Sequence, residues 1–246
     1  MYMSLIVAVT LSLAANVALA ETASKKSTAA ETPDLQWNVQ NAETIQALRL
    51  KGDVKAGEED YRAYCESCHL PTGGGTPDGS IPQLAGQHAT VIIKQLADIR
   101  SGLRDNPAMY PFATRLPDAQ SLADVAAYIG TLCVPRDSAK YEAPDGPKLV
   151  AYGKVLYDKE CAQCHQPNGD GVKEKSYPVI AGQHYPYLLR QMIAIRDGKR
   201  GNTHPDMRRA IARYDNAQLA AIAAYQAMLS TQVRKWTTEP RYCKPS

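Results

Sequence analysis

The sequence predicts an all-α protein in which two helical domains of the same fold follow each other along the chain. The first observation is an internal repeat at a spacing of 96 residues, since the segment CESCH at 65–69 returns as CAQCH at 161–165. The second is that apolar residues recur at helical spacing, whereas no alternating run is long enough for a sheet. A length of 246 residues accommodates two small domains.

The N-terminal segment is predicted to direct export. Residues 1–20 carry no charged side chain and end in Ala18-Leu19-Ala20, a small-x-small pattern typical of signal-peptide cleavage. An uncleaved anchor is the alternative, because 20 largely apolar residues just span a bilayer and no Lys or Arg lies near Met1. With either reading, the rest of the chain lies outside the cytoplasm. Residues 21–50 are expected to form a tether or N-terminal extension.

The repeat defines the remaining segments. It places the first domain at 51–133 and the second at 148–230, and the Pro-containing stretch 134–147 between them is the predicted linker. Residues 231–246 are a tail that the repeat does not cover.

Each repeat is expected to contain the same helices. Apolar residues at i, i+4 and i+7 predict one helix per repeat, at Ile92, Leu96 and Ile99 and again at Leu188, Met192 and Ile195. A second apolar stripe follows in each repeat, and Asp118 and Asp215 precede these stripes as expected N-caps. Before each cysteine pair, a glycine and a tyrosine four residues apart share one face of a helix. They are Gly57 and Tyr61 in the first repeat and Gly153 and Tyr157 in the second.

The chemistry lies in the repeated Cys-x-x-Cys-His motif. Cysteines at i and i+3 project from one side of a helical turn, so two thiols can add across the vinyl groups of a porphyrin while the histidine reaches the iron. In an exported protein this motif indicates covalent c-type haem, attached here through Cys65 and Cys68 and through Cys161 and Cys164. A zinc site needs its cysteine pairs about 12–20 residues apart, and a thioredoxin-like pair needs a βαβ context. Neither condition is met, so two haem c groups are expected.

The pattern resembles class I cytochromes c in tandem, and closely the dihaem cytochrome c4 family. The shared features are Cys-x-x-Cys-His, a Pro-x-x-Ala-Gly-Gln segment, a helix with Gln and Arg, and a Met before the last helix. By this resemblance His69 and His165 are proximal iron ligands, and the carbonyls of Pro82 and Pro178 hold their Nδ1–H groups. The resemblance also implies that the glycine and tyrosine before each motif pack the first helix of the domain against its last, near Tyr128 and Tyr225.

The sixth ligand can be argued from the residues themselves. After the leader, Met109 is the only Met of the first repeat, 40 residues after His69, and Met207 falls 42 residues after His165. Both lie in segments with Asn and Pro, not on an apolar stripe, so we expect them to complete the two irons.

Histidine is the alternative sixth ligand. His88 and His184 stand at equivalent positions and would give bis-histidine irons. The Ala-Gly-Gln-His context is typical of a helix entry, where a histidine caps or forms hydrogen bonds. This alternative stays open from the sequence alone.

An iron with two axial side chains has no position for a substrate, which favours electron transfer over catalysis. We therefore expect a periplasmic dihaem cytochrome that is not an enzyme and carries single electrons between a respiratory donor and a terminal oxidase or reductase. The protein is expected to be soluble or anchored to the periplasmic face of the inner membrane. The alternatives are a haem enzyme of the peroxidase or thiosulfate-oxidising type and a fixed electron-transfer subunit of a membrane respiratory complex.

Charge is distributed unevenly along the chain. The total of +3 gives no signal for nucleic acid. Residues 51–133 hold 7 basic and 10 acidic side chains, whereas 148–246 hold 16 basic and 8 acidic ones. The basic side chains that bracket Met207 are Arg196, Lys199, Arg200, Arg208, Arg209 and Arg213. They either steer an acidic redox partner or anionic lipid toward the second haem, or form a solvated face while Arg100 and Arg196 bind haem propionates.

Two cysteines lie outside the motifs. Cys133 ends the last helix predicted for the first domain, and Cys243 lies near the C-terminus. In an oxidising compartment we expect them to pair as a disulfide, the alternatives being two free thiols or a bridge from one of them to another chain.

Overall fold

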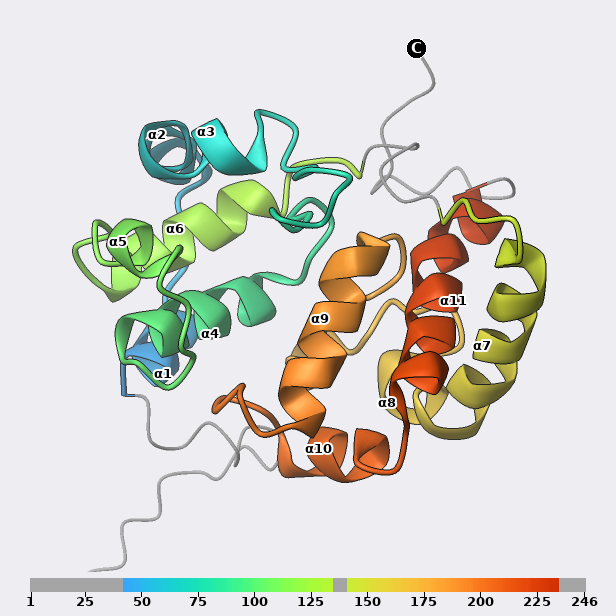
Figure 1. Ribbon diagram of the computed structural model, residues 1–246. Coiled ribbons are helices and arrows are strands. Elements are labelled where there is room, and N and C mark those ends of the chain that lie inside the picture. The colour runs from blue at the N-terminus through green and yellow to red at the C-terminus, as the bar shows by residue number, and fades with distance from the viewer. Residues whose placement is uncertain (1–41, 135–140, 235–246) are drawn as a thin grey trace, which may run out of the picture. The chain divides into compact units, whose positions relative to one another are not determined.

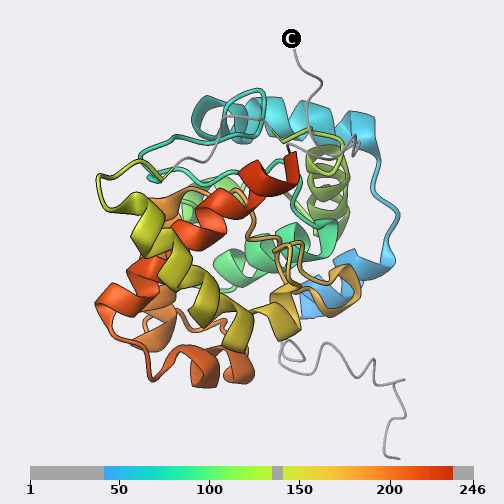
Figure 2. The same ribbon diagram turned by 90° about the vertical axis from the view of Figure 1, so that its right-hand side faces the viewer.

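The computed structural model describes residues 42–134 and 141–234, with side chains as far as 229. These residues form helices and connecting loops (Figures 1 and 2). No strand occurs among them. Val172 and Tyr177 form an isolated antiparallel β-bridge. The predicted all-α class is confirmed.

The helices of the two repeats occur in the same order. The first repeat holds α1 (Ala42–Arg49), α2 (Val54–Tyr64), α3 (Glu66–His69), α4 (Ala89–Arg100), α5 (Tyr110–Ala113) and α6 (Ala119–Ile129). The second holds α7 (Gly146–Glu160), α8 (Ala162–His165), the 3-10 turn η2 (Lys173–Lys175), α9 (Tyr185–Arg196), α10 (Pro205–Ile211) and α11 (Asn216–Arg234). From α2 to α6 and from α7 to α11, each element has a counterpart in the other repeat, apart from η2.

The first and last helices of each repeat pack at a glycine. A Cβ atom at Gly57 in α2 would lie 1.9 Å from the carbonyl oxygen of Asp124 in α6, and one at Gly153 in α7 would lie 1.9 Å from that of Ala221 in α11. Only a residue without a side chain permits these backbones to come so close. The predicted packing of the first helix against the last is confirmed in both repeats.

Aromatic pairs extend this packing by one helical turn. The ring centroids of Tyr61 and Tyr128 lie 5.2 Å apart, and those of Tyr157 and Tyr225 also lie 5.2 Å apart. Tyr61 and Tyr157 are both fully buried. Buried tyrosine pairs therefore fill the interior of a chain that contains a single Phe.

The last helix of each repeat begins at the predicted N-cap. The carboxylate of Asp118 accepts a hydrogen bond from the backbone N–H of Ser121 at 2.9 Å. The carboxylate of Asp215 accepts one from the backbone N–H of Gln218 at 2.7 Å, and the Gln218 side chain accepts one from the backbone N–H of Asp215 at 3.1 Å. Both caps satisfy N–H groups that a helix start leaves without a partner, and both predictions are confirmed.

Part of the segment assigned to a tether is in fact an ordered helix. Residues 42–49 form α1, which packs against α4 and α6. Thr44 and Ala47 are fully buried there, and Glu43 forms an ion pair with Arg100 at 3.1 Å. The sequence AETIQALR is short and mostly polar, so its apolar stripe gives little signal until its partner helices are known.

The predicted boundaries shift at two other places. Helix α7 begins at Gly146, within the segment 134–147 assigned to the linker, and α11 continues to Arg234, beyond the predicted domain end at 230. In the part of the chain that the structure describes, no helix is long and apolar enough to cross a membrane. The predicted leader Met1–Ala20 lies outside that part.

Candidate functional site

The two cysteine and histidine motifs adopt the same turn. In the first, the backbone N–H of His69 donates to the carbonyl of Cys65 at 2.9 Å, and in the second His165 donates to Cys161 at 2.9 Å. The four motif cysteines are half-buried free thiols. Burial is the main cause that raises the pKa of Cys65 and of Cys161 to about 12. The first cysteine of each pair therefore presents a neutral thiol next to a buried histidine.

Both motif histidines are held in one orientation. The Nδ1–H of His69 donates to the carbonyl of Pro82 at 3.0 Å, and that of His165 donates to Pro178 at 3.1 Å. Burial lowers the pKa of both imidazoles, which opposes protonation. Since Nδ1 carries the proton, Nε2 presents a lone pair, and no described residue forms a hydrogen bond with it. A neutral imidazole with a fixed tautomer and a free Nε2 is the form that binds iron.

Glycines after each motif allow this orientation, and the sequence analysis missed them. Gly75 and Gly171 have φ values of 64° and 66°, and a Cβ atom on them would lie 2.6 Å and 2.5 Å from the carbonyl oxygens of Pro82 and Pro178. The same carbonyls accept the histidine hydrogen bonds. The signal that could have revealed these glycines is the repeat itself, because they also stand 96 residues apart.

The buried tyrosines fix the chain directly after each motif. The hydroxyl of Tyr61 donates to the carbonyl of Leu70 at 2.7 Å, and that of Tyr157 donates to Gln166 at 2.6 Å. Leu70 and Gln166 both have a φ of 66°, an unusual value for residues other than glycine. These hydrogen bonds therefore hold a turn that would otherwise be unfavourable.

The two candidate methionines are both half-buried but differ in local structure. Met109 is the N-cap of α5, and Met207 lies within α10 and packs against the hydrophobic core of the second repeat. Helix α10 forms because Pro205 occupies its first turn and His204 caps it, accepting a hydrogen bond from the backbone N–H of Asp206 at 3.1 Å. The cap explains a histidine that has no counterpart in the first repeat.

Equivalent arginines tie the segments after the methionines to the preceding helix. Arg100 donates to the carbonyls of Leu116 and Ala113, the latter at 3.5 Å. Arg196 donates to the carbonyl of Tyr214 at 3.2 Å and also binds Asp197. Both guanidinium groups thus hold the backbone near the methionines, whereas the sequence analysis considered both as ligands of haem propionates and Arg196 also as part of a basic surface.

The histidines that were alternative ligands lie between the two repeats. His88 donates from Nε2 to the carbonyl of Asp170 at 2.8 Å, and His184 donates from Nε2 to the carbonyl of Gly74 at 2.8 Å. Asp170 and Gly74 are themselves 96 residues apart, so the two contacts are equivalent across the repeat. Each histidine therefore contacts the loop after the motif of the other repeat.

Two glutamines make a matching pair of contacts. The side chain of Gln87 accepts from the backbone N–H of Val179 at 2.9 Å and donates to its carbonyl at 2.9 Å. Gln183 does the same with Gln83, at 3.0 Å and 2.8 Å. The repeated Gln-His pair thus joins the halves by reciprocal hydrogen bonds, a role that the sequence analysis did not foresee.

A buried polar cluster also lies between the repeats. Lys94 and Asp98 form a buried ion pair, and Asn202 donates to Asp98 at 2.8 Å from the other repeat. Arg104 and Arg200 both bind the glutamines at the repeated positions 95 and 191. Burial is the main cause that lowers the pKa of Lys94 to about 8 and that of Arg200 to about 9. The sequence analysis noted a helix with Gln and the basic side chain of Arg200 but not their contacts, since nothing in the repeat indicates contact across it.

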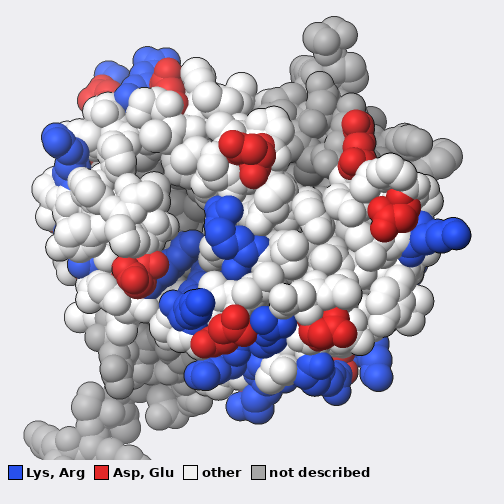
Figure 3. All heavy atoms as spheres, in the orientation of Figure 1, with Lys and Arg blue, Asp and Glu red and all other residues white. Residues whose placement is uncertain are grey.

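The basic side chains near Met207 are less free than the sequence suggested. Arg209 pairs with Asp206 and Arg213 with Glu160, while Arg196 and Arg200 are bound as described above. Lys199 and Arg208 are the two of the six for which the described residues provide neither an ion pair nor a side-chain hydrogen bond. Lys and Arg nevertheless gather over α10 and the end of α9 (Figure 3).

Of the two cysteines outside the motifs, the structure describes only Cys133. Cys133 is half-buried and follows α6, whereas Cys243 lies outside the described residues. Their pairing stays a prediction.

The donor set of each motif turn fits covalent haem, because two free thiols and one neutral imidazole lie within one helical turn. No group of three or more His, Cys, Asp or Glu suited to a metal ion occurs in the described part of the chain. The protein side of each site is therefore a haem-binding turn and not a metal cage.

Comparisons with known proteins agree with this geometry. The family model for cytochrome c matches residues 150–230, and that for subunit III of cbb3-type cytochrome c oxidase matches 52–129. Cytochrome c4 of Pseudomonas aeruginosa is 34% identical over 184 residues, which are 71% of this chain and 87% of that protein. The thiosulfate dehydrogenase electron acceptor of Stutzerimonas stutzeri is 37% identical, over 71% of this chain and 82% of that protein.

A solved structure shows the same fold. The crystal structure of reduced cytochrome c4 from Pseudomonas stutzeri superposes with a TM-score of 0.63 and 30% identity, covering 72% of this chain and 98% of that one. The chain therefore belongs to the dihaem cytochrome c4 family, and it is an electron-transfer protein with two class I cytochrome c domains and two covalently bound haem c groups.

Proposed function

We propose that this chain carries single electrons in the periplasm between a respiratory donor and a terminal oxidase or reductase. His69 and Met109 would be the axial ligands of the first iron, and His165 and Met207 those of the second. When bound, each haem supplies a one-electron iron couple, and a thioether ligand raises its potential relative to a second histidine. The export signal predicted in residues 1–20 supports the periplasmic location.

The single observation that carries the ligand assignment is the matched state of the two motif histidines. Each donates from Nδ1 to a proline carbonyl and leaves Nε2 free. The methionines are supported by their equivalent positions, by their partial burial and by the arginines that hold the segments after them. His88 and His184 are less suitable, because their Nε2 atoms already donate across the repeats.

The absorption spectrum of the oxidised protein tests this proposal. Coordination of Fe(III) by methionine gives a weak near-red band, and we expect Met109→Leu and Met207→Leu each to remove about half of its intensity. Met192→Leu is the matched control, because Met192 is a buried core residue of α9 and should leave the band unchanged. A band that survives both ligand substitutions would contradict the assignment. Cyanide uptake by the resting oxidised protein would instead favour the haem-enzyme alternative.

The donor is proposed from the relatives. One relative is named a thiosulfate dehydrogenase electron acceptor, which makes a thiosulfate-oxidising enzyme a candidate donor for this chain. Stopped-flow reduction by such an enzyme should saturate with its concentration. Reduction no faster than that by thiosulfate alone would exclude this donor.

Charge is proposed to guide an acidic redox partner to the second domain. Lys199 and Arg208 are the basic side chains near Met207 that remain available for such a partner. We expect the rate of electron exchange with an acidic partner to fall as salt increases, and Arg208→Glu to slow it about three-fold at low salt. A rate that does not depend on salt would exclude this guidance.

A further inference from the structure

The outer face of α4 in the first repeat is covered by a helix. Ile93, Ala97 and Arg100 share this face at i, i+4 and i+7. Ile93 and Ala97 are buried at 5% and 0% exposure and belong to the same core cluster as Ala47 of α1. Arg100 pairs with Glu43 of α1 at 3.1 Å. Helix α1 therefore lies over this face and places an acidic residue of its first turn against the end of α4.

In the second repeat, no helix of the described residues covers the equivalent face of α9. Its residues are Leu189, Ile193 and Arg196, each 96 positions after its counterpart. Leu189 and Ile193 are only half-buried, and Arg196 pairs with its own neighbour, Asp197.

The segment equivalent to α1 follows a different course. Counting 96 residues on from α1 leads to 138–145, of which residues 141–145 are described and contain no helix. From this segment Tyr141 stacks on Tyr185 at a centroid distance of 4.5 Å and so covers only the start of α9.

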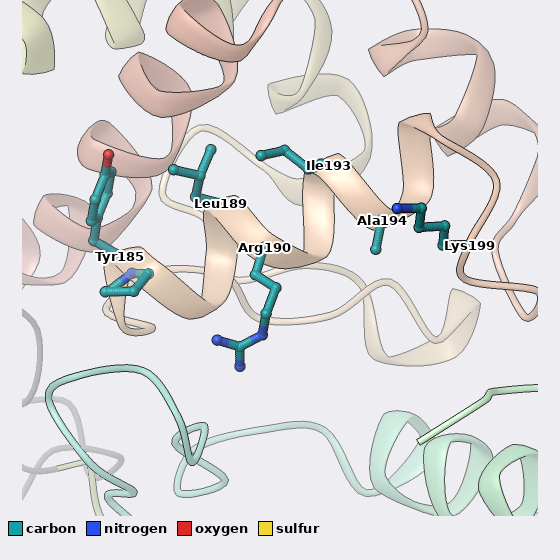
Figure 4. Close-up of a pocket in the computed structure, with 7 residues that line it drawn as sticks. Tyr185, Leu189, Arg190, Ile193, Ala194 and Lys199 are labelled. Carbon is teal, nitrogen blue, oxygen red and sulfur yellow. The ribbon is translucent and has the colours of Figure 1, made fainter. Parts of the chain in front are cut away.

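The uncovered face forms an open pocket of about 460 Å³. Among the described residues it is lined by Tyr185, Pro186, Leu189, Arg190, Ile193, Ala194 and Lys199. Tyr185, Leu189 and Ile193 project from the same side of α9, Arg190 from the opposite side, and Lys199 lies beyond the end of the helix (Figure 4). The apolar row spans two helical turns, about 12 Å, which is the length of an eight-residue helix such as α1.

The charges around the pocket specify the sign of its occupant. Lys199 is exposed, Arg190 is exposed but donates to the carbonyl of Gly79 at 2.8 Å, and the pocket lining contains no acidic residue. A helix that lies on α9 as α1 lies on α4 would place its first turn at the Lys199 end. Acidic residues are favourable in the first turn of a helix, so the same residues would satisfy both the dipole and the lysine.

We propose that this α9 pocket is a docking site for a short amphipathic helix with an acidic first turn, supplied by a partner protein. The helix places small and apolar side chains between Leu189 and Ile193, as α1 does at Ile93 and Ala97, and its acidic turn faces Lys199. The proposed function enters in one respect only, because it makes this partner a redox protein.

A binding experiment with the full-length, haem-loaded protein tests the proposal without electron transfer, so it can fail independently of the proposed function. The probe is a stapled, fluorescently labelled helical peptide with the sequence of residues 42–50, AETIQALRL. Its partner peptide carries Lys in place of the glutamate. We expect the acidic peptide to bind at least three-fold more tightly, measured by fluorescence anisotropy.

Substitutions locate the binding. Ile193→Glu should weaken the acidic peptide about ten-fold, and Lys199→Glu should weaken it about three-fold while strengthening the lysine peptide by a similar factor. This exchange of preference remains informative even if Ile193→Glu disturbs the fold. Val155→Glu and Lys159→Glu on α7 are the matched controls and should change neither affinity, since Val155 is 64% exposed on another helix.

Three outcomes would overturn the proposal. They are the absence of peptide binding, binding that Ile193→Glu and Lys199→Glu leave unchanged, and a dimer in analytical ultracentrifugation that Ile193→Glu dissociates. The last would assign the face to a second copy of this chain.

Discussion

The two repeats agree where they hold the haem and differ where they face outward. The histidine to proline hydrogen bonds measure 3.0 Å and 3.1 Å, and the tyrosine pairs are 5.2 Å apart in both repeats. Outside this core, the first repeat carries α1 over α4, whereas the second leaves the same face of α9 open. Their charges also differ, since the second repeat and its tail hold twice as many basic as acidic residues, 16 against 8. The common geometry serves the cofactor, and the differences lie on surfaces that a partner can reach.

The helix crossings should respond most strongly and equally in both repeats. Gly57→Ala and Gly153→Ala each place a methyl group 1.9 Å from a backbone carbonyl oxygen. Helical backbones cannot yield as a side chain can, so we expect a loss of about 3 kcal/mol in the free energy of unfolding for each variant. Denaturant titration followed by circular dichroism measures this loss.

Gly130→Ala is the control for these substitutions. Its nearest contact would be 3.3 Å, and its φ of −63° suits any residue, so the change should be within about 0.5 kcal/mol. A loss at Gly57 without a similar loss at Gly153 would mean that the two crossings are not equivalent.

A substitution in α1, the helix that covers α4, should lower the stability of the first repeat, whereas the equivalent substitution in the second repeat should not. Ala47→Glu places a carboxylate at a position that is 0% exposed. We expect α1 to detach from α4 and α6 while the rest stays folded, so the expected loss is about 2 kcal/mol, less than a buried charge would otherwise cost. Hydrogen exchange should then rise in α1 and on α4 but not on α9.

Ala143→Glu is the matched control for the cover. Ala143 stands 96 residues after Ala47 but lies in the half-buried segment before α7. We expect a change within about 0.5 kcal/mol there. An equal loss of stability in Ala47→Glu and Ala143→Glu would contradict the proposal that a helix covers this face in the first repeat and not in the second.

The haem-binding turns were predictable because their signals are local and repeated. Cys-x-x-Cys-His and the N-cap at Asp118 follow from residue type and spacing within one or two helical turns, whereas the packing role of Gly57 was implied by the resemblance to tandem cytochromes c. The repeat doubled every such signal. Fold class and cofactor could therefore be derived without knowledge of the tertiary structure.

Contacts across the repeats could not be derived in this way. His88 could be read as an iron ligand because its sequence context does not reveal the carbonyl of Asp170 that it binds. Lys94 is a charged residue whose side chain is buried beside Asp98 and donates to the carbonyl of Asn202 in the other repeat at 3.4 Å. Helix α1 is too short and polar for its periodicity to be recognised. These features depend on partners distant in sequence, which no local pattern specifies.

The tyrosine hydroxyls should have a smaller effect, again equal in both repeats. Tyr61→Phe and Tyr157→Phe each remove a donor, at 2.7 Å and 2.6 Å, to a turn whose own residues, Leu70 and Gln166, are exposed. We expect each to cost about 1 kcal/mol, the net contribution of one intramolecular hydrogen bond, because water can reach the turn carbonyl that loses its partner. Thermal unfolding compares them with Tyr110→Phe, whose ring is 50% exposed and which should change little. A stable Tyr157→Phe beside a destabilised Tyr61→Phe would show that the two turns are not equivalent.

The smallest effect is expected where α1 meets Arg100. Glu43→Gln removes an ion pair whose side chains are 27% and 18% exposed, so solvent screens much of its attraction, and a loss of about 0.5 kcal/mol is expected. That loss should shrink in 1 M salt, whereas the loss from Ala47→Glu should persist, because only the former depends on screened charge. Asp197→Asn, which removes the pair with Arg196, is the counterpart in the second repeat. Arg100 and Arg196 also hold the backbone after a methionine. The near-red band of Glu43→Gln and of Asp197→Asn should therefore be measured together with unfolding. A change in the band would show that the ion pair positions the proposed methionine ligand as well as the helix. An unchanged band with reduced stability would limit Glu43 to attaching α1.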